Sequence, residues 1–277
     1  MTKYALLLLA LIGIIQPILA QQDKYLWLEE VDGKAASKFA EAQNKITFEK
    51  LSKEKDYQFI YDKSLEILNS TDKIATPSIQ GKYVYNFWKD KDHVRGIWRR
   101  CLLANYINNK LDWETLLDID AMSQKDNIKW VFKEASGLYP NYTKFLISLS
   151  KGGGDAVVIK EFDADKKEFI ENGFTIDEAK GSAGYVDNNT LIVSTDFGEG
   201  TLTTSGYSRQ VKLWKRGTLL KNAQLIYEGE TSDVAASGYV LRDGQQVYIS
   251  ITRVQTFFTS QQLIWKDNKA IKLDIAN

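Results

Sequence analysis

Apolar residues that recur at helical spacing predict two amphipathic helices near the N-terminus. In the first, Ala35, Phe39, Ala42 and Ile46 share one face, and Asp32 is the candidate N-cap residue. The second helix begins near Asp56, and the residues of its apolar face are Tyr57, Ile60, Tyr61, Leu65 and Leu68. The polar run 69–72 ends it, so we expect a two-helix segment before the rest of the chain.

From Ile79 onward the hydrophobic pattern changes to the alternation that is typical of β-strands. The predicted strands form four groups that repeat at roughly 45 to 50 residues, the period expected for four-stranded propeller blades. Asp243-Gly244 is a hairpin signal in the last group. The groups are 79–88, 94–107 and 113–119; 128–133, 143–149, 156–162 and 168–170; 184–186, 190–194, 210–214 and 224–227; and 236–241, 246–252, 257–265 and 269–275.

Three groups share a motif in which an aliphatic strand ends in Trp and a basic residue follows. The instances are Ile97-Trp98-Arg99, Leu213-Trp214-Lys215 and Ile264-Trp265-Lys266. A β-sandwich with Trp in its strands would carry the same residues, but repetition at a fixed period favours a propeller. The sequence therefore predicts a mainly β fold, with an incomplete propeller of about four blades over residues 73–277 and the helical segment at 21–72 before it.

The first twenty residues are typical of a signal peptide. Lys3 precedes an apolar run from Ala5 to Ile15, and Ala20 is a small residue at the expected cleavage point. The alternative is an uncleaved anchor, but the run is shorter than the ~20 residues that a spanning helix needs. We expect residues 1–20 to be removed, and the protein to be exported to the periplasm or secreted without a stable membrane anchor.

Composition and charge narrow the choice of partners. The chain has 277 residues, 44% of them hydrophobic, so it can bury a substantial core. Its 36 Lys and Arg balance 36 Asp and Glu, which gives no electrostatic basis for binding nucleic acid or an anionic membrane. Trp88-Lys89 and Trp98-Arg99-Arg100 have side chains that stack on bases, but a half-buried strand gives the same pattern. We expect no nucleic-acid partner.

The sequence contains few residues or motifs that could form a catalytic site. His93 is the only histidine and Cys101 the only cysteine, so an internal disulfide is excluded and a zinc site has few ligands. A serine nucleophile in an α/β-hydrolase lies in a G-x-S-x-G turn, and Gly181-Ser182-Ala183-Gly184 lacks the first of those glycines. His93 lies in a turn with no motif that supplies its partners. Cys101 is expected to be buried and unreactive.

Three other segments carry residues that bind ions or phosphate elsewhere, and a fourth has the residues of an acid pair. Gly152-Gly153-Gly154 lacks the Lys-Ser/Thr that follows in a phosphate-binding loop. Asp118-Ile119-Asp120 and Asp163-Ala164-Asp165 could bind calcium, but neither continues into a loop with enough oxygen ligands. Glu29-Glu30 are neighbours in sequence and need not share a site. We interpret these residues as turn and surface residues, and we predict no catalytic, cofactor-binding or metal-binding residue and no cofactor.

A series of segments resembles the bacterial prolyl oligopeptidase-like serine peptidases. Tyr25-Leu26-Trp27-Leu28-Glu29-Glu30-Val31 resembles the N-terminal opening of that family. Tyr83-Val84-Tyr85-Asn86-Phe87-Trp88 and the segment 92–100 resemble its first blade, which Trp113-Glu114-Thr115-Leu116-Leu117-Asp118 closes. Further matches, in the same order as in the family, are 148–156, 195–198 and 202–207.

The resemblance implies a seven-bladed propeller over an α/β-hydrolase domain, in which the propeller limits access to short, unfolded peptides. It places residues 21–72 on the hydrolase side and leaves this chain without the Ser/Asp/His triad. We therefore expect an N-terminal fragment that is inactive alone and that self-associates or is marginally folded. The alternatives are a free-standing binding or scaffold module, and one half of a split peptidase completed by a polypeptide carrying the hydrolase domain.

Overall fold

The computed structural model of the protein describes residues 23–30 and 33–275 and divides into two compact units, with the division between Ile67 and Leu68 in the sequence. The predicted signal peptide, at residues 1–20, and the predicted N-cap Asp32 lie outside the described residues. In the part of the chain that is described, no helix is both long and apolar enough to cross a membrane.

The first unit is helical, as predicted. It contains a short 3-10 helix η1 (Leu26–Glu29) and the helix α2 (Lys34–Leu51), and helix α3 (Tyr57–Asn69) begins in it. The Trp27 ring packs edge-on against Phe39, with ring centroids 5.5 Å apart. No residue of α2 or α3 is buried, and the residues of the predicted stripes that remain exposed include Phe39, Ile46, Ile60, Tyr61, Leu65 and Leu68.

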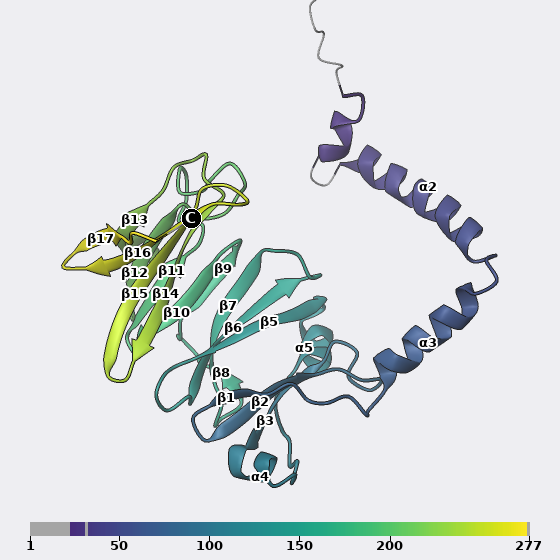
Figure 1. Ribbon diagram of the computed structural model, residues 1–277, viewed down its shortest axis with the longest axis horizontal. Coiled ribbons are helices and arrows are strands. Elements are labelled where there is room, and N and C mark those ends of the chain that lie inside the picture. Colours follow the sequence, from purple (N-terminus) through teal and green to yellow (C-terminus); the bar gives the residue numbers. More distant parts are fainter. Residues whose placement is uncertain (1–22, 31–32, 276–277) are drawn as a thin grey trace, which may run out of the picture. The chain divides into compact units, whose positions relative to one another are not determined.

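The second unit consists mainly of four antiparallel sheets, which confirms the mainly β prediction (Figure 1). The strands lie side by side in the order of the sequence, except that the last strand of the second sheet pairs with the third strand of that sheet, and we call the sheets blades 1 to 4. Blade 1 is β1 (Ser78–Gln80), β2 (Tyr83–Trp88), β3 (Ile97–Leu102) and β4 (Glu114–Asp118); blade 2 is β5 (Trp130–Gly137), β6 (Lys144–Lys151), β7 (Val157–Asp163), β8 (Glu168–Phe169) and β9 (Thr175–Ala179); blade 3 is β10 (Ser182–Asp187), β11 (Thr190–Ser194), β12 (Gln210–Lys215) and β13 (Gln224–Glu228); blade 4 is β14 (Ala235–Asp243), β15 (Gln246–Val254), β16 (Ser260–Lys266) and β17 (Lys269–Lys272).

Several local predictions were wrong. The predicted strand 94–107 is a strand only over β3, and its second half is the helix α4 (Leu103–Ile107). A helix that the sequence analysis missed, α5 (Ile119–Asp126), follows β4, and the Asp118 carboxylate accepts a hydrogen bond from the Ala121 N–H at 2.9 Å. In blade 2, β8 and β9 both pair with β7, so two short strands share the outer position. A short 3-10 helix, η2 (Leu220–Asn222), precedes β13.

The hydrophobic core lies between consecutive blades as three clusters. The first joins blades 1 and 2 around Tyr85, Trp98, Phe145 and Phe162. The second joins blades 2 and 3, and the third joins blades 3 and 4; their central residues are Leu146, Ile176, Leu191 and Trp214 in the second, and Ile192, Val211, Ile251 and Leu263 in the third. No cluster among the described residues joins blade 1 to blade 4, so the four blades form an open arc, a partial propeller.

The Trp motif identified the third strand of a blade in each of its three instances. Trp214 and Trp265 are the penultimate residues of β12 and β16, as predicted. Trp98, by contrast, is the second residue of β3, so the strand begins rather than ends at this Trp. The Trp98 side chain is nevertheless buried, because it lies on the face of β3 that packs against Phe145 and Phe162 of blade 2.

Candidate functional site

The only histidine has an orienting carboxylate but no nucleophile. His93 Nδ1 lies 2.9 Å from Asp90 Oδ1, and the His93 backbone N–H donates to the same oxygen. Partial burial raises the pKa of Asp90, but hydrogen bonds from the Trp88 indole and from His93 outweigh it and lower the pKa to about 2. In the described part of the chain, no serine, threonine or cysteine is hydrogen-bonded to His93. The pair therefore shapes the β2–β3 turn.

The serines with nearby glycines are engaged in the fold. Ser182, in the Gly181–Gly184 segment, begins strand β10 and lies opposite Ser194 of β11, with which β10 pairs antiparallel. A second segment, Gly206-Tyr207-Ser208-Arg209, has the first glycine of the nucleophile motif and was missed in the sequence analysis. Ser208 is 2% exposed, and its hydroxyl donates to the Gln210 carbonyl at 2.7 Å. Neither serine is bonded to a histidine among the described residues, so neither has the activated geometry.

The paired aspartates serve backbone and side-chain partners of the fold. Asp120 accepts hydrogen bonds from the backbone N–H groups of Arg95 and Gly96, and Asp163 accepts those of Asp165 and Lys166. Asp165 in turn accepts a hydrogen bond at 3.0 Å from Arg100, which crosses from blade 1 to blade 2. Within residues 23–30 and 33–275 there is no group of three or more potential metal ligands.

The remaining candidates also have local roles. Gly152 and Gly153 have positive φ angles in the turn between β6 and β7, as the predicted hairpin requires. Cys101 is 2% exposed, as expected, and burial raises the pKa of its thiol. Glu29 lies in η1, and Glu30 is the residue that ends it.

The first strands of three blades line one cavity of about 350 Å³. The cavity lies between β5, β10 and β14, so it opens on the inner side of the arc rather than between two stacked sheets. Its walls carry both polar and charged side chains, among them Glu134, Ser136, Tyr139, Ser182, Ser237, Tyr239 and Arg242. Hydrogen-bond donors and acceptors both line this cavity, so its walls can pair with the N–H and C=O groups of a polar ligand.

Arg242 is the cation of this cavity. It is half-buried at the end of β14, and its guanidinium lies 4.9 Å from the centre of the Tyr139 ring of blade 2. One of its Nη atoms donates to the Val186 carbonyl of blade 3 at 2.7 Å. Arg242 therefore connects three blades at the inner wall. The sequence analysis missed this residue, although its position directly before the Asp243-Gly244 turn signalled a strand end.

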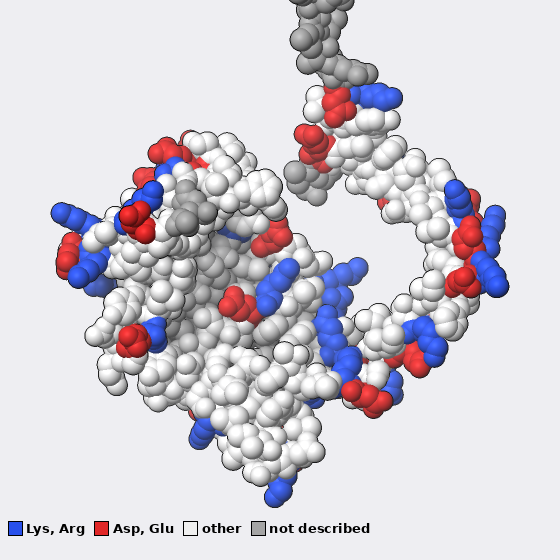
Figure 2. All heavy atoms as spheres, viewed as in Figure 1, with Lys and Arg blue, Asp and Glu red and all other residues white. Residues whose placement is uncertain are grey.

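Residues of both charges lie on the face of the molecule that Figure 2 shows. Basic and acidic residues are spread over the elements visible there. This agrees with the equal numbers of basic and acidic residues in the chain. The balanced composition gives no basis for long-range attraction of a strongly charged partner.

Comparison with known proteins gives a consistent family. A model of the prolyl oligopeptidase N-terminal β-propeller domain matches residues 19–270. The chain is 40% identical over 242 residues to the uncharacterized peptidase y4nA of Sinorhizobium fredii, covering 86% of this chain and 33% of the relative. It is 32% identical over 213 residues to the uncharacterized peptidase RP174 of Rickettsia prowazekii, covering 73% and 29%.

Solved structures of proline-specific peptidases have the same fold as this chain. A post-proline cleaving enzyme from Rickettsia typhi superposes with a TM-score of 0.81 and 28% identity, covering 90% of this chain and 38% of that enzyme. A prolyl endopeptidase superposes with a TM-score of 0.71 at 16% identity, over 92% of this chain and 37% of its own, and supports the fold alone. The chain thus spans about a third of the length of the curated relatives that it matches.

Proposed function

The chain belongs to the family of prolyl oligopeptidase N-terminal β-propeller domains, and on this premise we propose that it supplies four blades of the propeller of a peptide-cleaving enzyme. In the proposal, the inner side of the arc is part of the passage through which peptides reach a catalytic domain. In this proposal the catalytic serine, acid and histidine come from outside these 277 residues, because no serine, threonine or cysteine among the described residues is hydrogen-bonded to His93.

The observation that carries the proposal is the cavity between β5, β10 and β14. A peptide in extended conformation exposes unpaired backbone N–H and C=O groups, which need partners wherever water is displaced. The hydroxyls of Ser136, Ser182 and Ser237 offer both donors and acceptors, and Arg242 offers donors only. Such a wall accepts many peptide sequences, as a passage must, because it pairs with backbone rather than with particular side chains.

The exposed ends of the arc support the presence of further blades in the working protein. On blade 4, the residues of the outer face that remain exposed include Tyr239, Leu241, Tyr248 and Ile271. Corresponding residues of the inner blades are buried in the three clusters. Each Å² of apolar surface that such a face leaves in water lacks roughly 25 cal/mol of the stabilising free energy that burial would give. We propose that further blades cover it, on the same or a complementing polypeptide.

A chimera tests the passage. Residues 23–277 would replace the matching N-terminal part of the Sinorhizobium fredii peptidase, and cleavage of a short proline-containing chromogenic peptide would be compared with that of a folded protein carrying the same site. We expect the chimera, and not the chain alone, to cleave the short peptide and to spare the folded protein. Arg242→Met should change kcat/KM for peptides several-fold, while Lys221→Met, at an exposed position in η2, should not.

Two results would count against this function. Cleavage by residues 23–277 alone would show a catalytic site within the chain. Equal kcat/KM for the parent chimera, Arg242→Met and Lys221→Met would show that peptides do not pass the inner cavity.

We also propose that the protein works outside the cytoplasm. The support is the sequence of residues 1–20, with Lys3 before an apolar run and Ala20 before Gln21. Mass spectrometry of protein recovered from the producing cell should give a mature N-terminus at Gln21 or within a residue or two. Intact Met1 on soluble cytoplasmic protein would contradict export.

A further inference from the structure

Arg242 lies on the face of β14 that packs against blade 3, away from the free end of the arc. Residues two apart on a strand share a face, so Arg242 lies on the same face as Ala236 and Gly238. Ala236 belongs to the cluster that joins blades 3 and 4, and a Cβ atom at Gly238 would contact side chains of blade 3. The further blades proposed above adjoin the opposite face, where Tyr239 and Leu241 are exposed.

The Arg242 guanidinium is held in place by contacts that leave most of its donors unused. Nη2 donates to the Val186 carbonyl at 2.7 Å, and the guanidinium lies 4.9 Å from the centre of the Tyr139 ring. Tyr139 in turn packs edge-on against Tyr142, with ring centroids 6.0 Å apart. Nε and Nη1 have no hydrogen-bond acceptor among the described residues. The planar group has two edges that each present two parallel N–H groups, and the bond to Val186 uses a single N–H, so one complete edge is unused.

No acidic side chain neutralises Arg242 in the inner cavity. Among the described lining residues Arg242 is the one basic residue and Glu134 the one acidic residue, and no ion pair joins them in the part of the chain that the structure describes. Arg100, Arg216 and Arg253, by contrast, each pair with one or two carboxylates. A half-buried guanidinium with a free two-donor edge favours a carboxylate, whose two oxygens match that edge.

The two ends of the cavity differ in chemistry. Ser182 is the first residue of β10 and Ser237 the third residue of β14, whereas Arg242 is the last but one of β14. A strand rises by about 3.4 Å per residue, so about 17 Å of β14 separates Ser237 from Arg242. An extended peptide of about five residues spans this length. A peptide whose last residue reaches Arg242 therefore has its backbone beside the serines.

We propose that Arg242 binds a carboxylate of a peptide in the inner cavity, and that this carboxylate is the C-terminus of the peptide. The inference rests on the proposed function, which places peptides in this cavity, and it adds the direction in which they lie. The carboxylate accepts two parallel hydrogen bonds from the free edge of the guanidinium. The backbone runs from there along β14 toward Ser237 and Ser182. An Asp or Glu side chain offers the same chemistry, and the experiment separates the two sources.

Calorimetric titration of the full chain with three capped pentapeptides tests the proposal. The peptides are acetyl-Ala-Gly-Ala-Gly-Ala with a free C-terminus, the same peptide as its C-terminal amide, and acetyl-Ala-Gly-Glu-Gly-Ala amide. Because hydrogen bonds to charged groups are the strong ones, the free acid should bind at least about tenfold more tightly than the neutral amide. The Glu-containing amide should bind like the neutral amide. If it binds as tightly as the free acid, the assignment of the carboxylate to the C-terminus is overturned.

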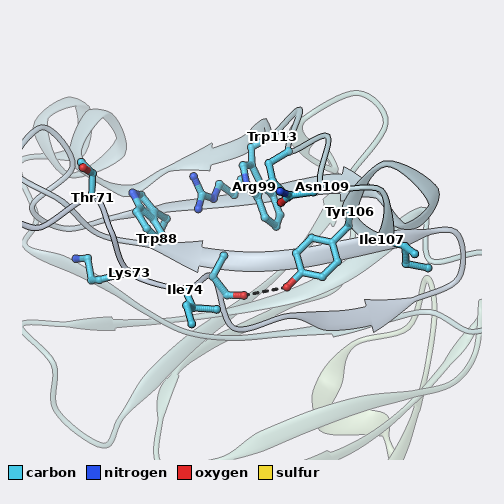
Figure 3. A pocket seen from close by; sticks show the side chains of 11 residues that line it. Thr71, Lys73, Ile74, Trp88, Arg99, Tyr106, Ile107, Asn109 and Trp113 are labelled. Atoms are coloured by element: carbon cyan, nitrogen blue, oxygen red, sulfur yellow. Dashed lines mark hydrogen bonds between the residues drawn. The ribbon is translucent and has the colours of Figure 1, made fainter.

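Two matched substitutions locate the carboxylate. Arg242→Gln removes the charge and the two-donor edge, so the affinity for the free acid should fall to that for the amide, and the affinity for the amide should not change. Arg99→Gln is the control, because Arg99 also lies against aromatic rings, those of Trp88 and Trp113 (Figure 3). Arg99 lines a separate cavity of about 610 Å³ on blade 1, at the other end of the arc. This substitution should leave the binding of both peptides unchanged.

The outcomes separate this inference from the proposed function. Equal affinity of the unmodified protein for the free acid and the amide overturns the inference alone, whether or not the Arg242 variant folds. Binding of neither peptide overturns it and also counts against a peptide passage at the inner cavity. Thermal melts check that each variant folds. A loss of acid binding in Arg99→Gln but not in a folded Arg242→Gln places the carboxylate outside the inner cavity and overturns the inference as well.

Discussion

Glu161 and Arg216 are joined by two parallel hydrogen bonds of 2.7 Å each, across the boundary between blades 2 and 3. The Glu161 side chain has no exposed surface, whereas that of Arg216 is 27% exposed. The carboxylate also accepts hydrogen bonds from the Tyr185 hydroxyl at 2.9 Å and from the Phe174 backbone N–H at 3.1 Å. This buried charge is therefore fully partnered, and its partners come from both blades.

The asymmetry in burial predicts unequal effects of removing either partner. Arg216→Met leaves a buried carboxylate without its cation and should lower the free energy of unfolding by about 3–5 kcal/mol. Glu161→Gln leaves an arginine that reaches water and keeps a polar group for Tyr185, so its cost should be smaller. Urea unfolding of both variants measures the difference. Equal costs for the two variants would contradict this account of the pair.

The same carboxylate predicts a dependence of stability on pH. Burial raises the pKa of Glu161, but hydrogen bonds from Arg216, Phe174 and Tyr185 outweigh it and hold the pKa below its ordinary value of 4.5. Because the unfolded chain binds this proton more tightly, the contribution of Glu161 is fully present well above pH 4.5. It is lost as the pH falls from there through the lower pKa of the folded state.

Unfolding free energies between pH 7 and pH 3 test this dependence. The advantage of the unmodified protein over Glu161→Gln should be constant near neutral pH and should shrink below about pH 4.5. Asp90, whose pKa is about 2, contributes equally to both proteins and cancels in the difference. Glu168→Gln, at an exposed position in β8, should follow the unmodified protein throughout. An advantage that does not change with pH would refute the role of ionised Glu161.

Blades 3 and 4 approach so closely at Gly238 that any side chain at this position should lower the stability of the protein. A Cβ atom at Gly238 in β14 would contact Ile192 and would lie 2.6 Å from Val211 Cγ1, both in the core of blade 3. Gly238→Ala should therefore cost about 1–3 kcal/mol of unfolding free energy. Gly184→Ala is the matched control on β10, where the nearest atom would lie at an ordinary 3.7 Å. Equal stability of the two variants would show that the blades are less tightly packed.

The outer face of blade 4 predicts self-association of the isolated chain. Leu241 and Tyr248 are directly opposite each other on β14 and β15, and 45% and 40% of their surfaces are exposed. Replacing both by Lys should shift the protein toward monomer in size-exclusion chromatography with light scattering, because charges on this face repel and stay hydrated. Leu219→Lys, at an exposed position before η2, should leave the distribution unchanged. A monodisperse monomer of the unmodified chain would contradict the prediction.

Much of the fold could be predicted because each blade is a meander with local turn signals. The Asp243-Gly244 turn and the polar residues between the other strands placed the four groups correctly. The two missed helices have different causes. Residues 103–107 are apolar and aromatic, and periodicity over so short a run does not distinguish a helix from a strand. For α5 the signal was present, since Asp118 is an N-cap residue and Asn127 ends the helix in the left-handed region.

The sites could not be predicted because they are made by distant segments. Trp88-Lys89 and Trp98-Arg99-Arg100 were recognised as aromatic and basic pairs, but Arg99 stacks on Trp88, the last residue of β2, and on Trp113, directly before β4. Its neighbour Arg100 points into blade 2 instead. Likewise, Glu161 and Arg216 are 55 residues apart in sequence, and their pairing depends on how two blades pack. Strand alternation gives the face of a residue, and the packing of blades gives its partner.

The three clusters of the core have a consequence for how the protein is made. Every strand pairs within its own blade, and every cluster joins blades that are consecutive in sequence. The first cluster needs only residues that precede strand β9, so it can form while the C-terminal blades are still being synthesised. Each later blade then meets a completed surface as it leaves the ribosome. During synthesis from the N-terminus the blades can therefore fold one after another from one end of the arc, because few contacts join segments that are far apart in the sequence.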